Sequence, residues 1–424
     1  MPVFSPYVVK HIHLDQEQDF YVDTTPPEKC YYLFWWKQIP LGHLFAECDD
    51  HADRDEFQLK VLRTIQPCVD FYIFKAAVKN KPYKTAFLKY NYEEFSGAMH
   101  AIFSSQMVTE TPKPLDVSVI VCTRNRSRNL QCCLHSLLNQ KFTPREIIVV
   151  DNAPTDDSTL QVVQRFPGVI YHNEPRSGLS IARNAGLRRA GAPVVAFTDD
   201  DVIAHPLWLY RVWETFLLPE VSAMTGLVVP IALETESQQL FEKYWSFNRG
   251  YEDRLFGPEF IDRHLQIGPP VWQIGAGANM AFRKSVFEGI GYFDERLGAG
   301  ASGCSEDTEL WYRILLKGLN VYYNPRAVAY HEHRKEFSAF RRQMYSYVRG
   351  HAAAALIQQK LNQKAGYRKR IFMEYPVYYL RRLVKGFPHY RLKDRTLFSE
   401  MRGWSSGILF YKKYCSKPPE AGYQ

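Results

Sequence analysis

The feature that most constrains the fold is an alternation of short apolar segments and amphipathic helices that begins near Leu115. Apolar segments recur at 117–122, 146–152, 168–171 and 193–197, and each has the length of a buried strand. Helical spacing of apolar residues follows the first of them, in Leu130, Cys133, Leu134, Leu137 and Leu138. Strands that alternate with helices predict an α/β domain whose parallel strands are joined by right-handed crossovers.

The length of 424 residues allows two or three domains. A polar, proline-containing stretch at 109–114 marks one boundary, and a change to a helical, basic and aromatic composition near Phe337 marks another. The predicted organisation is an accessory domain over 1–112, the α/β domain over 113–336 and a helical region over 337–424.

The first 112 residues contain no catalytic constellation. Tyr31–Trp36 and Ile39–Ala46 read as two strands joined by a turn, and 55–65 reads as a short helix. The segments 71–78 and 85–92 fit either strands or short helices. A small mixed or β-rich unit is therefore expected here.

The last 88 residues predict helices over 340–359 and 378–385. Their interleaved Arg, Lys, Tyr and Phe leave two interpretations open. The helices can lie on an anionic membrane surface, or they can cap the α/β domain with basic residues facing water.

The net charge and the cysteines indicate which binding partners and which cellular compartment to expect. The net charge of +8 suits anionic substrates or an anionic membrane but does not by itself indicate nucleic acid. The eight cysteines are scattered without a Cys-x-x-Cys pair, and Cys122 and Cys133 fall at apolar positions, which favours reduced thiols. No signal-peptide layout and no apolar stretch of about 18 residues is found. We expect a cytoplasmic protein, with peripheral attachment at the inner face of a membrane left open.

Polar clusters follow four of the predicted strands, at 123–126, 151–152, 199–201 and 331–333. Ligands of open α/β sheets bind at the carboxyl ends of the strands, so these clusters predict the rim of one pocket. Asp199, Asp200 and Asp201 repel one another unless a cation joins them, and carboxylates suit Mg²⁺ or Mn²⁺. The alternative is a solvated acidic turn ahead of the next helix.

A second acidic pair, Glu306–Asp307, follows Ser305 at a predicted helix start. Ser305 can cap this helix, whose positive dipole end would lower the pKa of both acids, whereas burial and the aspartate cluster would raise it. Two exposed acids that merely suit the dipole are the alternative. Small residues at 275–278 suggest a backbone that approaches a ligand closely, next to Asn279.

In combination these motifs resemble glycosyltransferase family 2, whose members have the GT-A fold. The resemblance covers Val117 to about His333, half of the chain, and rests on six motifs in order. These are VSVIVCTRNR at 117–126, IVVDN at 148–152, GLSIARNAG at 178–186, TDDD at 198–201, GANMAFR at 277–283 and SEDTEL at 305–310. It implies a Rossmann-like mixed sheet flanked by helices.

The resemblance also implies roles for individual residues. In the nucleotide-sugar site, Asp151 would accept hydrogen bonds from the base or ribose and Arg183 would reach the diphosphate or the sugar. The remaining residues assigned to this site are Thr123, Arg124, Arg126, Asp199, Asp200 and Asn279. Asp199 and Asp201 would form the DxD motif that holds Mn²⁺ or Mg²⁺, with His331 or His333 as a further metal ligand.

The reaction implied is displacement with inversion at the anomeric carbon, with Asp307 as general base and Glu306 beside it. The donor would be a UDP-, GDP- or dTDP-sugar. The acceptor would be a carbohydrate, a lipid-linked intermediate or a protein, in polysaccharide or glycoconjugate synthesis. Nucleic acid is not expected as a partner.

Two other functions compete with this one. A nucleotidyltransferase also combines a nucleotide pocket with acidic metal ligands, but it usually needs a glycine-rich phosphate loop, and 123–126 has no glycine. A non-catalytic carbohydrate- or nucleotide-binding scaffold could use Trp35 and Trp36 to hold sugars.

Overall fold

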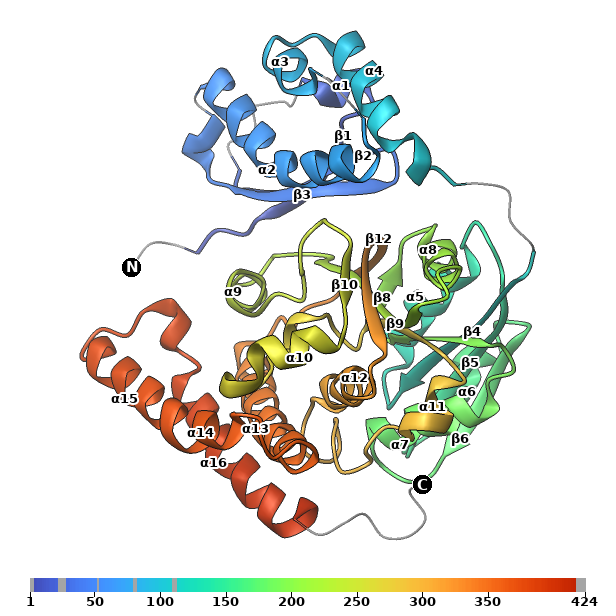
Figure 1. The fold of residues 1–424 in the computed structure, drawn as a ribbon, viewed down its shortest axis with the longest axis vertical. Helices are drawn as coiled ribbons and strands as arrows, with labels where there is room; N and C mark the ends of the chain where they lie inside the picture. The colour runs from blue at the N-terminus through green and yellow to red at the C-terminus, as the bar shows by residue number, and fades with distance from the viewer. Residues whose placement is uncertain (1–3, 22–27, 52, 79–81, 109–112, 417–424) are drawn as a thin grey trace.

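The computed structural model describes residues 4–21, 28–51, 53–78, 82–108 and 113–416. Its main element is a mixed sheet of nine strands surrounded by helices (Figure 1). The strands follow the order β10-β12-β9-β11-β7-β4-β5-β6, and β8 pairs with β12. The expected mixed α/β fold is therefore present.

The first half of this sheet follows the alternation read from the sequence. The strands β4, β5, β6 and β7 pair in parallel, and helices connect them. Their bounds are β4 Leu115–Thr123, α5 Ser127–Leu138, β5 Pro144–Asn152, α6 Ser158–Val163, β6 Val169–Glu174, α7 Leu179–Arg189 and β7 Val194–Asp199.

The second half is mixed, because β11 runs antiparallel between β7 and β9 while β12 is parallel to β9. Its elements are β8 Val202–Ala204, α8 Trp208–Thr215, β9 Val221–Pro230, α9 Glu236–Trp245, β10 Arg254–Phe256, α10 Pro258–His264, β11 Asn279–Arg283, α11 Val286–Ile290, α12 Glu306–Leu316 and β12 Asn320–His331. The stretch 249–270 contains β10 and α10.

Alternate residues of the central strands fill separate cores on the two faces of the sheet. Ile120 of β4 belongs to one core with residues of α7 and α12. Its neighbours Val119 and Val121 belong to the other core, with residues of α5 and α8. Because both faces of these strands are covered, successive residues are apolar, as the continuous apolar segments in the sequence indicated.

The N-terminal part has its own small sheet, β1-β2-β3, with helices packed on it (Figure 1). The bounds are β1 Val8–His13, α1 Glu17–Phe20, β2 Cys30–Trp36, β3 Ile39–Ala46, α2 Arg54–Lys75, α3 Tyr83–Leu88 and α4 Tyr92–Phe103. The short helix expected at 55–65 continues to Lys75, so most of 71–78 is helical, as is 83–88.

The N-terminal part packs on the central sheet through Trp35, which joins an apolar cluster with Leu227 and Val328. Trp35 and Trp36 are each 1% exposed, so neither offers a surface to a sugar. The expected linker at 109–114 lies mostly outside the described residues, and the division of the chain into three domains stays a prediction.

Helices make up the C-terminal part, as the sequence indicated. They are α13 Phe337–Leu361, α14 Tyr367–Lys369, α15 Tyr375–Gly386 and α16 Leu397–Phe410, and they lie along the lower left of Figure 1. A π-helical turn, η5, covers Arg370–Glu374 between α14 and α15. Among the described residues, none of the helices is both long and apolar enough to cross a membrane.

Candidate active site

Three strand ends bring the expected acidic residues together. Asp199 is the last residue of β7, and Asp200 and Asp201 form the turn before β8. Thr123 ends the neighbouring strand β4, and its hydroxyl donates to Asp200 Oδ2 over 2.7 Å. His331 ends β12, with its Nε2 3.4 Å from Asp201 Oδ1. Sheet topology therefore assembles polar residues that are up to 208 positions apart in the chain.

The guanidinium of Arg126 bridges two of the three aspartates. It donates to Asp200 Oδ1 at 2.5 Å and to Asp201 Oδ2 at 2.8 Å. Burial raises the pKa of Asp200 to about 7 even though Arg126 opposes this. Burial acts on Asp201 too, but His331, Arg126 and Arg334 outweigh it and lower the pKa of Asp201 to about 2. The guanidinium groups of Arg126 and Arg334 thus offset part of the repulsion between the aspartates.

Arg183 joins the aspartate cluster to the second acidic pair. It projects from α7, is 2% exposed, and donates to Glu306 Oε1 at 2.5 Å and to Asp199 Oδ1 at 3.3 Å. Burial lowers the pKa of this guanidinium, but the two carboxylates raise it above its ordinary value. Arg183 is thus paired with both carboxylates inside the protein, and its contact with the diphosphate or the sugar stays a prediction.

Glu306 and Asp307 occupy the first turn of α12, as predicted, but Ser305 does not cap this helix. Ser305 has a left-handed backbone (φ 72°), and its side chain accepts no capping hydrogen bond. Its hydroxyl instead lies 3.1 Å from Cys304 Sγ. A left-handed serine is strained, and such residues are concentrated at functional sites. This left-handed residue makes a sharp turn directly before Glu306 and Asp307.

The two neighbouring acids have different surroundings. Glu306 is 5% exposed and paired with Arg183, whereas Asp307 is only partly covered. Burial and the adjacent Glu306 raise the pKa of Asp307 to about 7, while Arg183 and backbone groups of Thr308 and Gly277 partly oppose this. A carboxylate with a pKa near neutrality is well matched to proton removal at physiological pH. Of the two acids, Asp307 therefore suits the role of a base.

The small residues before Asn279 make room for the side chains of Asp307 and Arg183. A Cβ added to Gly277 would lie 3.0 Å from Asp307 Oδ2 and 3.2 Å from an Arg183 nitrogen. Asn279 itself is fully buried. Its amide accepts from Trp208 Nε1 (2.8 Å) and donates to the Leu227 and Ala327 carbonyls (3.0 and 2.8 Å). The structure thus brings Asn279 to the sheet interior and not to the rim.

His331 and His333 are linked to a buried glutamate that the sequence did not single out. The two Nδ1 atoms lie 3.0 Å apart, and His333 Nε2 lies 2.9 Å from Glu242 Oε2. When the His333 Nε2 hydrogen is donated to Glu242, His333 Nδ1 accepts from His331, and His331 Nε2 then faces Asp201 as a lone pair. Burial lowers the pKa of His331 to about 4, which favours its neutral form.

The remaining predicted residues lie on the β4–β5 side. Asp151 pairs with Thr123 in the strand register, is fully buried, and accepts from Tyr171 over 3.0 Å. Burial raises the pKa of Asp151. Arg124 is exposed and donates to Ser177 Oγ over 2.8 Å. Both sit at the expected edge, although the Asp151 carboxylate is covered by protein.

A divalent cation fits this donor set only in part. Among the described residues, no three His, Cys, Asp or Glu side chains converge on a preformed metal site. Asp199 keeps 34% of its side chain exposed, whereas Asp201 and His331 are buried. Mg²⁺ is commonly held by one or two carboxylates together with substrate phosphates. The residues therefore suit a cation shared with a diphosphate, with Asp199 as the accessible protein ligand.

Sequence reasoning missed Glu242 and Arg334. Glu242 contacts His333 from 91 residues away, and Arg334 lies 3.6 Å from Asp201 through its guanidinium. Only Arg334 could have been found from the sequence, since it directly follows the His-Glu-His motif.

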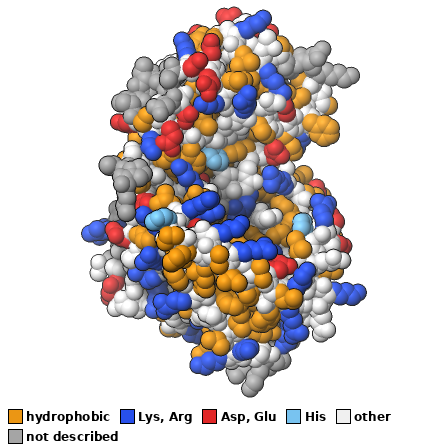
Figure 2. Space-filling model, turned by 90° about the vertical axis from the view of Figure 1, so that its left-hand side faces the viewer, with side chains coloured by type: hydrophobic (Ala, Val, Ile, Leu, Met, Phe, Trp, Pro, Cys, Tyr) orange, Lys and Arg blue, Asp and Glu red, His pale blue; other side chains and the backbone are white. Residues whose placement is uncertain are grey.

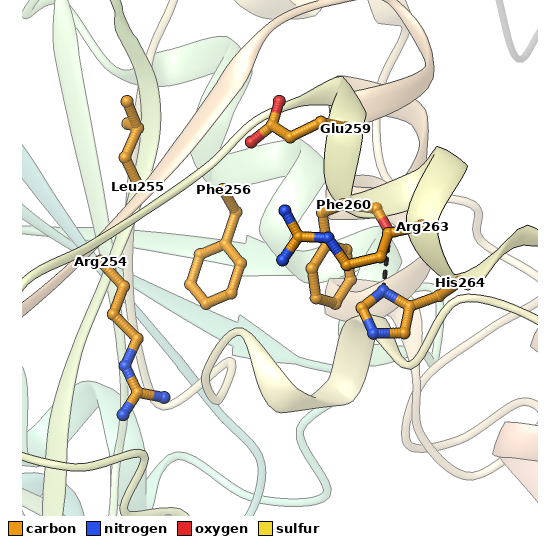
Figure 3. Close-up of a pocket in the computed structure, with 7 residues that line it drawn as sticks. All are labelled: Arg254, Leu255, Phe256, Glu259, Phe260, Arg263 and His264. Atoms are coloured by element: carbon orange, nitrogen blue, oxygen red, sulfur yellow. Dashed lines mark hydrogen bonds between the residues drawn. The ribbon is translucent and has the colours of Figure 1, made fainter.

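A hollow of about 370 Å³ lies beside β10 and α10, away from the acidic cluster (Figure 3). Phe256, Phe260 and Arg263 are among the residues that line it. Its strand β10 pairs with the start of β12, whereas His331 is at the end of β12.

Residues 118–291 match the family model described as glycosyl transferase family 2. The chain is 28% identical over 289 residues to the glucosyl-dolichyl phosphate glucuronosyltransferase of Haloferax volcanii, covering 64% of this chain and 88% of that protein. It is 25% identical over 229 residues to the pre-mycofactocin glycosyltransferase of Mycobacterium tuberculosis, covering 53% of this chain and 44% of that one.

A chondroitin synthase of Pasteurella multocida is 27% identical over 246 residues, which cover 52% of this chain and 25% of the synthase. The chain thus spans less than half of the mycobacterial and Pasteurella relatives. Among solved structures, a mannosyltransferase from Pyrobaculum calidifontis in complex with GDP-Man and Mn²⁺ is 19% identical. It superimposes with a TM-score of 0.44 over 73% of this chain and 78% of that one.

Proposed function

We propose that this chain, whose residues 118–291 match the glycosyl transferase family 2 model, transfers a sugar from a nucleotide-sugar donor to an acceptor hydroxyl, with inversion and with a divalent cation. The observation that carries the proposal is the pairing of Arg183 with Glu306. This pairing fixes one acid of the motif and leaves its neighbour, Asp307, partly open with a pKa near 7.

In the proposed reaction Asp307 takes the proton of the acceptor hydroxyl as its oxygen attacks the anomeric carbon. The attack comes from the face opposite the nucleoside diphosphate, so the anomeric configuration inverts. Glu306 and Arg183 keep Asp307 and Asp199 in fixed relative positions, because Arg183 contacts Glu306 and Asp199 directly.

The departing diphosphate needs positive charge near the aspartate cluster. Arg126 and Arg334 supply it from the protein, with 30% and 42% of their side chains exposed. A Mn²⁺ or Mg²⁺ ion held by Asp199, with Asp201 and His331 behind it, would add further charge stabilisation when bound. His333 then acts on the metal site only through His331, and Asp200 through Arg126 and Thr123.

The similar proteins suggest the class of acceptor. The Haloferax relative is named a glucosyl-dolichyl phosphate glucuronosyltransferase, and the Pasteurella relative is named a chondroitin synthase. We propose a lipid-linked or other glycoconjugate acceptor, a UDP-, GDP- or dTDP-sugar donor, and peripheral attachment at the inner face of a membrane. Thr123, Arg124 and Asp151 would bind the nucleoside. Asn279 would act indirectly, by holding β11 against β9 and β12 through its hydrogen bonds to Leu227 and Ala327.

Thermal unfolding with a panel of UDP-, GDP- and dTDP-sugars, each with and without Mn²⁺, tests the donor site. A ligand at about 100 times its Kd stabilises the folded state by about 2.7 kcal/mol. A shift with one nucleotide class that disappears with a chelator identifies the base and supports the cation. If no donor shifts the midpoint under either condition, the proposed site is wrong. Pyrophosphate release from a nucleoside triphosphate and a sugar phosphate would instead indicate a nucleotidyltransferase.

A further inference from the structure

A stripe of exposed apolar side chains runs along the continuous segment formed by η5 and α15 and ends at Phe387, the residue that follows α15. Its members are spaced four, three, four and three residues apart, which keeps them on one helical face. They are Met373, Val377, Leu380, Val384 and Phe387, with 64%, 45%, 60%, 69% and 76% exposed. At 1.5 Å per residue the stripe is about 21 Å long. No other part of the described chain covers it.

The opposite face of α15 is firmly packed, so the stripe is not a loose core face. Tyr379 and Gly386 are buried. Arg382 donates to Asp394 (2.8 Å) and to Glu400 (2.6 Å), and both acids are buried. These ion pairs fix α15 against α16, through Glu400, and against the segment before it, through Asp394, and they hold the stripe outward.

The surface around the stripe is strongly basic. Residues 361–416 contain thirteen Lys and Arg against three acids, so this stretch is more positive than the whole chain at +8. Two of the three acids are those paired with Arg382, which leaves Glu374 as the exposed acid. Figure 2 shows hydrophobic side chains gathered over the lower half of this face, with Lys and Arg around them.

The apolar surface continues past the end of α15. Tyr390 and Phe398 are 37% and 63% exposed, and their ring centroids lie 6.4 Å apart. Phe398 belongs to α16, whose exposed Arg402 and Leu409 follow at helical spacing. Aromatic rings beside long basic side chains are the composition of segments that lie at the boundary between headgroups and acyl chains.

We infer that this face, which we call the docking surface (Met373 to Phe387 with Tyr390 and Phe398), binds an anionic lipid bilayer. The stripe would enter the upper acyl region while Arg381 and Lys385 contact lipid phosphates. A second copy of the chain is a poor occupant, because two such basic surfaces would repel each other. An acidic protein would satisfy the charge but leave the stripe without an apolar partner.

The docking surface is rigidly connected to the site. Gly403 and Gly407 of α16 leave no room for a Cβ against the backbone of α13 at Tyr345 and Arg349. In turn Gly350 of α13 packs on Cys304, two residues before Glu306. A bilayer bound here would therefore be held at a fixed position relative to Asp307. This link matters for catalysis only if the acceptor is lipid-linked, and in that respect the inference rests on the proposed function.

Co-sedimentation of the full chain with vesicles tests the docking surface without using activity. Vesicles of neutral phosphatidylcholine are compared with vesicles that also contain anionic phosphatidylglycerol. We expect binding to the anionic vesicles, weakened at high salt. Leu380→Glu should reduce the partition coefficient on the order of tenfold, and Arg381→Gln with Lys385→Gln by a similar factor.

Leu217→Glu is the matched control, because Leu217 is 61% exposed and lies on the turn after α8, far from this face in the chain. It should bind like the wild type. Equal binding by Leu380→Glu and wild type would overturn the docking surface, as would no binding of wild type to anionic vesicles. Capture by soluble polyglutamate but not by vesicles would assign the basic face to an acidic macromolecule instead. Donor-induced thermal shifts stay unchanged in all these variants, so failure here is distinct from failure of the transferase proposal.

Discussion

Replacing Asp307 by Asn should abolish transfer and at the same time stabilise the fold at alkaline pH. Burial and Glu306 raise the pKa of Asp307 from 3.8 to about 7. At about 1.4 kcal/mol per pKa unit, ionising this group in the folded protein costs about 4 kcal/mol. Asn avoids that cost but loses one backbone hydrogen bond, worth about 1 kcal/mol. We therefore expect the free energy of unfolding to increase by at most about 3 kcal/mol in D307N.

The sign of the pH dependence follows from the raised pKa. The folded state binds the Asp307 proton more tightly than the unfolded state, so wild-type stability falls as pH rises from 3.8 towards 7. The penalty is complete above pH 7. The difference in free energy of unfolding between D307N and wild type should therefore grow by about 2–3 kcal/mol between about pH 5 and pH 8.

Urea unfolding at these two pH values measures the stability, and transfer to acceptor measures the activity. Loss of a general base should lower turnover by about 10²–10⁴-fold, with donor binding retained. Asp262→Asn is the control, since Asp262 is an exposed acid on α10. A stability difference that does not change with pH would refute the burial argument. Near-normal turnover in D307N would remove Asp307 from the role of base.

Three further substitutions test the supporting contacts. Arg183→Met should lower the free energy of unfolding by about 3–5 kcal/mol, because it leaves the buried Glu306 carboxylate unpaired; urea midpoints close to wild type would contradict this. Glu242→Gln should weaken Mn²⁺ binding in the presence of donor by about tenfold, because it loosens the orientation of His333, and the free Mn²⁺ signal in electron paramagnetic resonance measures it. An unchanged Mn²⁺ affinity would show that the Glu242–His333–His331 contacts do not affect metal binding. Gly277→Ala should reduce turnover by about tenfold or more while leaving donor-induced thermal shifts intact, since its Cβ would displace the Asp307 carboxylate; full turnover would show that the carboxylate has room.

The order and type of the central elements could be predicted from the sequence. The apolar runs at 117–122 and 193–197 became β4 and β7, and the acidic triplet came at the end of a strand as expected. Such features depend on the spacing of apolar residues over a few turns or pleats, which is local information. The length of a helix with a weaker local pattern was harder to predict, as α2 shows, which continues ten residues past the predicted 55–65.

The assignment of each acid's partner could not be predicted. Arg183 meets Glu306 across 123 positions, and Glu242 meets His333 across 91. The family resemblance implied Asp307 as the base with Glu306 beside it, and the sequence offered Ser305 as the cap of their helix. Only the packing of α12 against α7 decides that one acid is held by an arginine while its neighbour stays partly open.

The sequence by itself determined which residue types stand at the ends of the strands, because strand and helix periods are fixed by the backbone. The tertiary structure decided which charges meet, and hence which carboxylate can take a proton. It also decided that the apolar stripe of α15 faces outward, since the helix period defines a face but not what covers it. Burial and pairing arise from contacts between distant segments, and no local pattern encodes them.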